Sequence, residues 1–297
     1  MSSASQPKDA KLEASSLFNV NGLVALVTGG GSGIGFMLAK ALARNGASKV
    51  YIAGRRLQAL QNAAKNIGPN VATVTCDVTS RESLQKAVEH VEKDAGYLNL
   101  VVCNSGISGP QATQVTPETT LEQFANDNFS IDVDKYTETF AVNSVAVWYT
   151  AMAFLKLLDK GNQKKNVRQS SQVVVISSIA GFNKKQTGGY AYAQSKAAAT
   201  HTTKMLAVAL PQWNIRANCV APGIFPSELS APFLTSLQDE SGEYGAVPRD
   251  MIPMQRLGEA TDMAGTMLYL ASGAGAYCNG AVVVLDGGRL GMFPSVN

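Results

Sequence analysis

A run of five apolar residues, 23–27, leads directly into a glycine-rich turn near the start of the chain. Such a run predicts a strand that is buried on both faces of a parallel sheet. The turn reads Thr-Gly-Gly-Gly-Ser-Gly-Ile-Gly over residues 28–35, and apolar residues then recur from Ile34 to Leu42 at the spacing of one helix face. Glycines let the backbone approach a ligand closely, and the start of a helix presents free N–H groups and a positive dipole end. The sequence therefore predicts an anion-binding site between this strand and this helix.

The composition limits the partners that the chain can have. With 45% apolar and 16% charged residues among 297, it suits a globular fold with a substantial core. The formal net charge is only +3 and no lysine or arginine run forms a stripe, so we expect no nucleic-acid partner. His90 and His201 are too far apart in sequence for a zinc motif, and we expect no metal site. The four cysteines show no Cys-x-x-Cys spacing and are expected to be reduced, mostly buried thiols.

The ends of the chain carry no recognisable targeting signal. Residues 1–19 are polar, lack arginine and predict a mobile N-terminal tail rather than a presequence. No apolar run approaches the roughly 20 residues needed to span a bilayer, so we expect no membrane partner. The C-terminal residues 295–297 do not form a usual peroxisomal address. We therefore expect a cytoplasmic protein.

Apolar runs alternate with helical patterns along the whole chain, which predicts an α/β fold. The expected architecture is a single doubly wound, Rossmann-type domain over residues 20–297, with a mostly parallel, seven-stranded sheet. Residues 107–131 are expected to be an inserted surface loop, and the apolar, proline-containing residues 224–253 suit a substrate loop. Thr79 and Glu82 predict a capping box at the start of a helix. The expected strands are 23–27, 49–53, 71–75, 98–102, 172–176, 215–220 and 281–285.

Two arginines follow the second expected strand, where dinucleotide-binding folds hold the adenosine ribose. An acidic residue there would accept a hydrogen bond from a ribose 2′-hydroxyl, but the chain reads Gly54-Arg55-Arg56. The guanidinium of Arg55 can offer a bidentate fork to a phosphate, which favours NADP(H) over NAD(H). The alternative is that both arginines are solvated residues at the start of a helix.

Polar residues at three further places suggest an active site. Tyr192 and Lys196 are four residues apart, so they share one face of a helix. Ser177 and Ser178 follow the fifth expected strand, at the carboxyl end where open α/β sheets bind ligands. Asn143 lies among apolar residues in a long helical pattern, and a buried asparagine must find hydrogen-bond partners. Each residue has an ordinary structural explanation by itself, but together they point to chemistry beside the predicted nucleotide site.

From about Gly22 to Gly288 the chain resembles the short-chain dehydrogenase/reductase family, in its shorter, single-domain branch. Residues 221–230 are also similar to the rhamnolipid-pathway β-ketoacyl reductases and their fungal relatives. The chain departs from the family's usual Asn-Asn-Ala-Gly by reading Cys-Asn-Ser-Gly at 103–106. Ser178 and Tyr192 are 14 positions apart, one more than is usual, so Ser177 stays open as the functional serine. The resemblance rests on the Thr-Gly-x-x-x-Gly-x-Gly turn, Val142-Asn143, Ser178, Tyr192-x-x-x-Lys196 and Pro222-Gly223.

The resemblance implies a catalytic set of Asn143, Ser178, Tyr192 and Lys196. Tyr192 would donate a proton to the carbonyl oxygen, and Lys196 would lower the pKa of its phenol from the usual value of about 10. Ser178 would hydrogen-bond the substrate oxygen, Asn143 would hold a water in a relay to Lys196, and Asp77 would bind the adenine amino group. The implied NADP(H)-binding set is Gly29, Ser32, Gly33, Ile34, Gly35, Arg55, Asp77, Val78, Asn104, Gly106, Tyr192, Lys196, Ile224 and Ser227.

The expected function is that of an NADPH-dependent oxidoreductase that interconverts a ketone and a secondary alcohol, with Tyr192 as general acid. A hydrophobic or bulky carbonyl compound suits the apolar content of residues 224–253, although core packing explains that content nearly as well. One alternative is a catalytically silent nucleotide-binding or scaffold protein of the same fold. Another, an epimerase or dehydratase of the longer branch, is disfavoured because little chain follows Gly223. Apolar residues on more than one face of the helices near 133–160 and 189–210 predict a homodimer or homotetramer.

Overall fold

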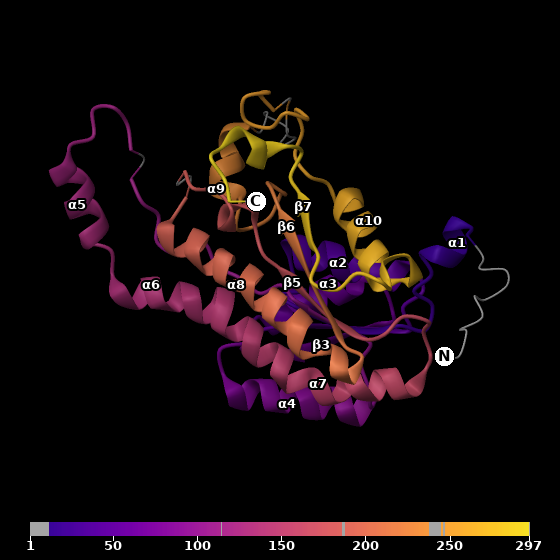
Figure 1. Ribbon diagram of the computed structural model, residues 1–297. Helices are drawn as coiled ribbons and strands as arrows, with labels where there is room; N and C mark the ends of the chain where they lie inside the picture. The colour runs from indigo at the N-terminus through magenta and orange to yellow at the C-terminus, as the bar shows by residue number, and fades with distance from the viewer. Residues whose placement is uncertain (1–11, 114, 186–187, 238–244, 246, 297) are drawn as a thin grey trace, which may run out of the picture.

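The computed structural model describes residues 12–113, 115–185, 188–237, 245 and 247–296. Within these residues seven strands form one sheet in the order β3-β2-β1-β4-β5-β6-β7, and every neighbouring pair is parallel (Figure 1). The predicted α/β class and seven-stranded sheet are confirmed. The strands are β1 Val24–Thr28, β2 Lys49–Gly54, β3 Val71–Thr75, β4 Leu100–Cys103, β5 Gln172–Ile176, β6 Arg216–Pro222 and β7 Val282–Leu285.

Helices cover both faces of the sheet, because the central strands are apolar on both sides. In β1 the side chain of Leu26 packs in the core cluster that contains residues of α4, α7 and α8, whereas Val27 packs in the cluster that contains residues of α2, α3 and α10. This alternation explains why the central strands read as continuous apolar runs. The helices are α1 Ala14–Leu17, α2 Gly33–Arg44, α3 Leu57–Ile67, α4 Arg81–Asp94, α5 Leu121–Phe129, α6 Val133–Phe140, α7 Ala146–Lys164, α8 Tyr190–Ala209, α9 Ala231–Leu234 and α10 Ala260–Ala271.

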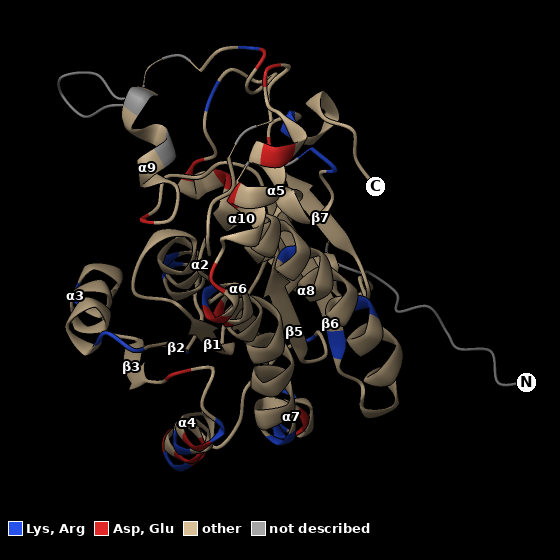
Figure 2. Ribbon diagram, turned by 90° about the vertical axis from the view of Figure 1, so that its left-hand side faces the viewer, with Lys and Arg blue, Asp and Glu red and all other residues tan. Residues whose placement is uncertain are grey.

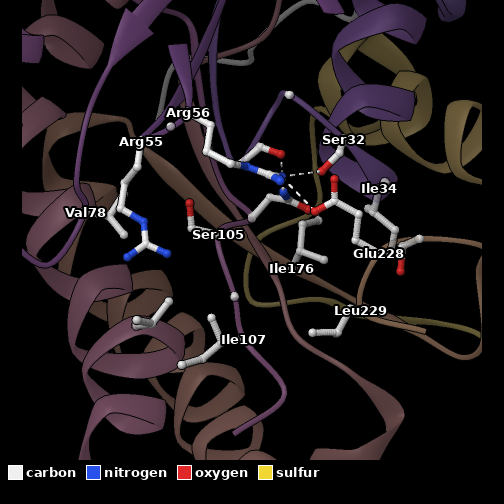
Figure 3. Close-up of a pocket in the computed structure, with 18 of the residues that line it drawn as sticks. Ser32, Ile34, Arg55, Arg56, Val78, Ser105, Ile107, Ile176, Glu228 and Leu229 are labelled. Atoms are coloured by element: carbon white, nitrogen blue, oxygen red, sulfur yellow. Dashed lines mark hydrogen bonds and ion pairs between the residues drawn. The ribbon is translucent and has the colours of Figure 1, made fainter. Parts of the chain in front are cut away.

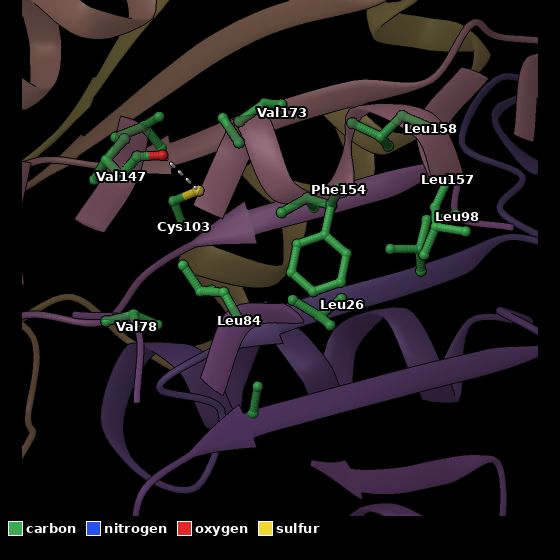
Figure 4. Close-up of a cluster of buried hydrophobic side chains, with 14 of the residues drawn as sticks. Leu26, Val78, Leu84, Leu98, Cys103, Val147, Phe154, Leu157, Leu158 and Val173 are labelled. Atoms are coloured by element: carbon green, nitrogen blue, oxygen red, sulfur yellow. Dashed lines mark hydrogen bonds between the residues drawn. The ribbon is translucent and has the colours of Figure 1, made fainter. Parts of the chain in front are cut away.

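Phe154 of α7 lies at the centre of the larger core cluster. Its ring is fully buried and lies close to Leu26 of β1, with Leu157 and Leu158 on the same helix (Figure 4). Truncation of a buried phenylalanine to alanine usually costs about 3–5 kcal/mol, because the cavity left behind only partly collapses. The packing of these side chains holds α7 against the sheet. It therefore also fixes the position of the residues that precede α7 in the same helical run.

The strand order reverses between β1 and β4, which lie side by side although two strands separate them in the sequence. Chain connections leave on opposite sides at such a point, so a crevice opens at the carboxyl ends of the strands. The glycine turn follows β1, Arg55 follows β2, Asn104 follows β4 and Ser177 follows β5. The fold therefore gathers the candidate site residues at one edge of the sheet.

Residues 133–164 form a nearly continuous helical run in which one π-helical turn, Ala141–Val145, joins α6 to α7. The run is long and apolar enough to cross a membrane by those two measures alone, but half of its most apolar stretch is buried inside the protein. The buried apolar residues of α7, such as Phe154 and Leu158, pack in the core beside the sheet, as in the core helix of an α/β fold. Figure 2 shows acidic and basic residues intermixed on α4, which lies beside α7.

Two local predictions are corrected by the structure. The N-cap of α4 is Ser80, whose side chain accepts a hydrogen bond from the Ser83 amide, and no Thr79–Glu82 capping box forms. Thr79 is unavailable because its amide and hydroxyl both donate to Asp77 Oδ1. The expected loop 107–131 contains a helix, α5, which begins with a Thr120–Gln123 capping box. This helix buries none of its residues, so local capping rather than core packing defines it.

The other predicted boundaries are those of the N-terminal tail and of the expected substrate loop. Of the predicted N-terminal tail, residues 1–11 lie outside the described residues, and Ala14–Leu17 form the single turn α1. Of the expected substrate loop 224–253, residues 238–244 and 246 lie outside them too. The described part begins after β6, includes α9 and returns through a small apolar cluster with Leu234, Val247 and Ile252.

Candidate active site

The turn between β1 and α2 has the backbone geometry of an anion site. Gly29 and Gly33 adopt positive φ angles of 65° and 52°, which favour glycine. A Cβ on Gly35 would lie 2.2 Å from the carbonyl oxygen of Gly29, so the turn closes only because this position has no side chain. Ser32 occupies the N-cap of α2, but its side chain accepts no hydrogen bond from the helix. The N–H groups of the first turn are therefore not capped by this side chain and can serve a ligand.

Asn104 fastens the end of β4 to the glycine turn. Its side-chain Nδ2 donates to the carbonyl oxygens of Thr28, at 2.9 Å, and Gly29, at 3.3 Å. In return, the hydroxyl of Thr28 accepts hydrogen bonds from the amides of Asn104 and Ser105. Asn104 thus orders the floor of the site, although the residues on either side of it depart from the usual family sequence.

The residues expected at the adenosine end line one cavity together with the glycine turn. Arg55 points into this space and makes no hydrogen bond or ion pair with the described residues (Figure 3). Asp77 lies beside it, and hydrogen bonds from Thr79 hold the pKa of its carboxyl below the usual value, so it is an anion at neutral pH. Val78 supplies an apolar wall. A cation and an acceptor thus flank the place where the fold family holds the adenosine half of a dinucleotide.

This cavity has a volume of about 620 Å³, within the range of small-molecule and cofactor sites. It extends from Arg55 past the glycine turn to Tyr192 and Lys196 on α8. Several predicted residues line it: Gly29, Ser32, Gly33, Ile34, Arg55, Asp77, Val78, Asn104, Gly106, Tyr192, Lys196 and Ser227. Its long, polar shape and the glycine cradle fit a dinucleotide, with the phosphates at the turn and the reactive end at Tyr192.

Of the predicted cofactor residues, Gly35 and Ile224 do not line the cavity. Gly35 instead closes the turn against the Gly29 carbonyl. The structure does not bring Ile224 to the cavity. Its side chain packs against the small apolar cluster of Leu234, Val247 and Ile252, and its carbonyl accepts a hydrogen bond from the Gly258 amide. Ser227, three residues later, does line the cavity. A Cβ on Gly33 would come within 2.9 Å of Ser227 Cβ, which shows how closely this segment approaches the glycine turn.

Ser177 and Ser178 differ in what their hydroxyls touch. The Ser177 hydroxyl is buried against α8, where its Oγ lies 2.8 Å from the carbonyl oxygen of Lys196 and 2.7 Å from Thr200 Oγ1. Ser178 has its hydroxyl on the other side of the chain, where it faces the Tyr192 hydroxyl and accepts a hydrogen bond from the Ala180 amide at 3.1 Å. Of the two, Ser178 is the one whose side chain interacts with the Tyr192 phenol, although Ser177 and not Ser178 lines the cavity.

Burial favours the neutral forms of Tyr192 and Lys196, so it shifts their pKa values in opposite directions. Desolvation raises the pKa of the Tyr192 phenol, and hydrogen bonding with Ser178 opposes this rise. Desolvation lowers the pKa of Lys196 to about 8, while Nζ donates to the Ile176 carbonyl oxygen at 3.0 Å and lies 5.8 Å from the centre of the Tyr192 ring. The direction of the Tyr192 shift is thus opposite to the expected lowering by Lys196, because desolvation by burial is its largest cause.

Asn143 is fully buried in the π-helical turn, and its side-chain amide is occupied. Oδ1 accepts from the Ile107 amide at 2.9 Å, and Nδ2 donates to the Ile107 carbonyl and to Ser195 Oγ. A Cβ on Gly106 would lie 3.2 Å from Asn143 Oδ1 and 3.4 Å from Lys196 Nζ. The structure therefore brings Asn143 and Lys196 together around Gly106, but the Asn143 side chain acts as a brace between segments.

Two residues that the sequence did not single out belong to this arrangement. Ser195 is fully buried, accepts from Asn143 and donates to the Tyr192 carbonyl oxygen at 2.7 Å. Its position in the sequence, between Tyr192 and Lys196, is the signal that could have identified it. Glu228 lines the cavity and pairs with Arg56, and nothing in the sequence relates these two residues, which are 172 positions apart.

Comparison with known proteins agrees with this geometry. Residues 29–289 match the family model described as Enoyl-(Acyl carrier protein) reductase. PhomF of Diaporthe leptostromiformis, a short-chain dehydrogenase/reductase, is 46% identical over 297 residues, which cover 99% of both chains. The rhamnolipids biosynthesis 3-oxoacyl-acyl-carrier-protein reductase of Pseudomonas aeruginosa is 29% identical over 91% of this chain and 97% of its own length. The solved RhlG/NADP complex of the same bacterium has a TM-score of 0.76 and 29% identity, and it covers 92% of this chain and 98% of that one.

The fold and site define an oxidoreductase with a nicotinamide dinucleotide site, a class that the RhlG/NADP complex also represents. The chain belongs to the short-chain dehydrogenase/reductase family. The expected similarity to the rhamnolipid-pathway reductases and their fungal relatives is confirmed.

Proposed function

We propose that the chain is an NADPH-dependent reductase of a ketone, with Tyr192 as the general acid. The observation that carries the proposal is that one cavity contains Arg55 at one end and Tyr192 with Lys196 at the other, with the glycine turn between them. When bound there, the nicotinamide would supply the hydride and the chain's own residues would manage the proton. Arg55, the N–H groups of the turn, Ser227 and Asp77 would hold the dinucleotide.

The reductive direction of this chemistry needs Tyr192 to carry its proton. A carbonyl that is being reduced needs a donor that still carries its proton, and the raised pKa keeps the Tyr192 phenol protonated at neutral pH. The Ser178 hydroxyl, beside that of Tyr192, would hydrogen-bond the same substrate oxygen as its charge develops. Lys196, with a pKa of about 8, is poised to return a proton toward Tyr192 near neutral pH.

The proposed role of Asn143 is to position a water in the proton relay to Lys196. Its side-chain amide braces Ile107 against Ser195, so we assign the water toward Lys196 to its backbone carbonyl in the π-helical turn. Single π-helical turns inside α-helices are frequent at functional sites.

We further propose that the substrate is a hydrophobic carbonyl compound. Ile107, Val142, Leu229 and Pro232 line the same cavity as Tyr192 and give it apolar walls. We also propose a homo-oligomer built through the helical run 133–164 and α8, because Trp148, Met205 and Val208 are large apolar side chains exposed on those helices. A cytoplasmic location stays a prediction from the sequence.

A panel of ketones and secondary alcohols, followed by NADPH absorbance, tests the proposed activity. We expect turnover of at least one apolar ketone with NADPH and slower turnover with NADH. Tight NADPH binding without turnover of any member of a broad panel would instead favour a silent nucleotide-binding protein.

A further inference from the structure

An ion pair joins two parts of the site that are far apart in the sequence. Arg56, which precedes α3, has Nη2 2.7 Å from Oε2 of Glu228, which lies in the segment after β6. The same nitrogen lies 3.5 Å from Oγ of Ser32, at the start of α2 (Figure 3). One guanidinium therefore contacts both the glycine turn and the segment 224–232.

The position of Glu228 is fixed by the backbone around it. The Ser227 amide donates to Ser230 Oγ at 2.9 Å, the Ser230 amide donates to Ser227 Oγ at 3.2 Å, and Ser230 Oγ donates to the Phe225 carbonyl oxygen at 2.6 Å. This tight turn holds Ser227 against Gly33, and the Glu228 side chain points toward Arg56 (Figure 3). Glu228 is thus one of the residues that line the cavity, and this turn sets the position of its backbone.

The two neighbouring arginines differ in their partners. Arg56 is engaged by Glu228, whereas Arg55 has no hydrogen bond or ion pair with the described residues and points into the same space. A phosphate that entered beside Ser32 and Arg55 would meet the Glu228 carboxylate, and it would need the same guanidinium that Glu228 already binds. Both side chains of the pair are largely exposed, at 64% and 63%, so the pair is weak and open to exchange.

We propose that Glu228 is a specificity-determining residue for the cofactor: its carboxylate competes with the cofactor's 2′-phosphate for the guanidinium of Arg56. The proposal rests on the proposed binding of NADP(H). Arg55 then gives the site its preference for the cofactor that carries a 2′-phosphate. Glu228 limits that preference because it already binds the guanidinium of Arg56. NADH, which lacks the 2′-phosphate, does not enter this competition.

Direct titration of NADPH and of NADH against the wild-type protein and Glu228→Gln tests the proposal, with the fluorescence of the reduced nicotinamide as readout. Because the amide keeps the shape of the side chain but loses its charge, we expect NADPH to bind about three- to tenfold more tightly and NADH to change less than about twofold. The matched control is Asp250→Asn, which removes one exposed carboxylate that does not line the cavity. It should leave the ratio of the two dissociation constants unchanged.

An unchanged or lowered NADPH affinity in Glu228→Gln, with NADH binding intact, would overturn the proposal. If Glu228→Gln weakened both cofactors equally, the residue would be structural, and Glu228→Ala would show the same equal loss. A wild-type protein that binds NADH as tightly as NADPH would refute the proposed cofactor instead. The experiment therefore separates failure of this inference from failure of the proposed function.

Discussion

Lys196→Met should stabilise the protein at neutral pH although we expect it to abolish turnover. The Lys196 side chain is almost fully buried, and its pKa falls from the ordinary 10.5 to about 8. Since one pKa unit is worth about 1.4 kcal/mol, burial disfavours the charged form by about 3 kcal/mol. Methionine removes that cost but leaves the Ile176 carbonyl oxygen without its 3.0 Å donor, at a loss of about 1 kcal/mol. The expected net gain at pH 7 is about 2 kcal/mol.

The way in which this stability difference varies with pH follows from the direction of the Lys196 pKa shift. A lysine whose pKa is lower in the folded state destabilises the fold fully below pH 8, and the cost fades as the pH rises toward the unfolded value of 10.5. The advantage of Lys196→Met over the wild type should therefore shrink by about 1.4 kcal/mol between pH 6.5 and pH 9, as that linkage predicts.

Urea denaturation of both proteins at the two pH values, followed by tryptophan fluorescence, measures this difference. Lys204→Met, an exposed lysine on the same helix, is the matched control and should show no such pH dependence. A Lys196→Met protein that is less stable than the wild type at pH 7, by an amount that does not vary with pH, would refute the reasoning from burial.

Further predictions concern the cofactor, the serines and the assembly. Arg55→Asp should narrow or reverse the preference for NADPH over NADH in a binding titration, and equal wild-type affinities would contradict the role of Arg55. Ser178→Ala should lower kcat about 10²–10³-fold in steady-state kinetics. Ser177→Ala should mainly cost about 0.5–1.5 kcal/mol of stability in a denaturation curve, because it removes buried hydrogen bonds to the Lys196 carbonyl and to Thr200 Oγ1, which still bond to each other; the reverse pattern would make Ser177 the functional serine. Light scattering at micromolar concentration should show a dimer or tetramer. A monomer would contradict the proposed assembly through residues 133–164 and α8.

The fold was predictable because its strongest signals are local. The central strands are buried on both faces and so read as continuous apolar runs, and β3 and β5 begin and end where the sequence predicted. The glycine turn was predictable for the same reason, since the 2.2 Å approach at Gly35 leaves no room for a side chain. Tyr192 and Lys196 share a helix face by spacing alone.

What the sequence left out depends on contacts between distant segments. The partners of Ser177 and Ser178 depend on how β5 meets α8, and adjacent residues leave a strand on opposite sides. The Arg56–Glu228 pair joins segments that only the topology brings together. The pKa direction of Tyr192 depends on burial, which a four-residue spacing does not reveal. Ser80 replaced Thr79 as the helix cap because Asp77 already binds Thr79.

The general-acid role of Tyr192 is tested most directly by Tyr192→Phe, with NADPH binding and ketone turnover measured on the same preparation. Phenylalanine keeps the ring and removes only the hydroxyl, so the fold and the affinity for NADPH should change little. Turnover should fall about 10²–10⁴-fold, the usual contribution of a positioned general acid. A Tyr192→Phe protein that binds NADPH normally and reduces its best ketone at nearly the wild-type rate would contradict the proposed mechanism.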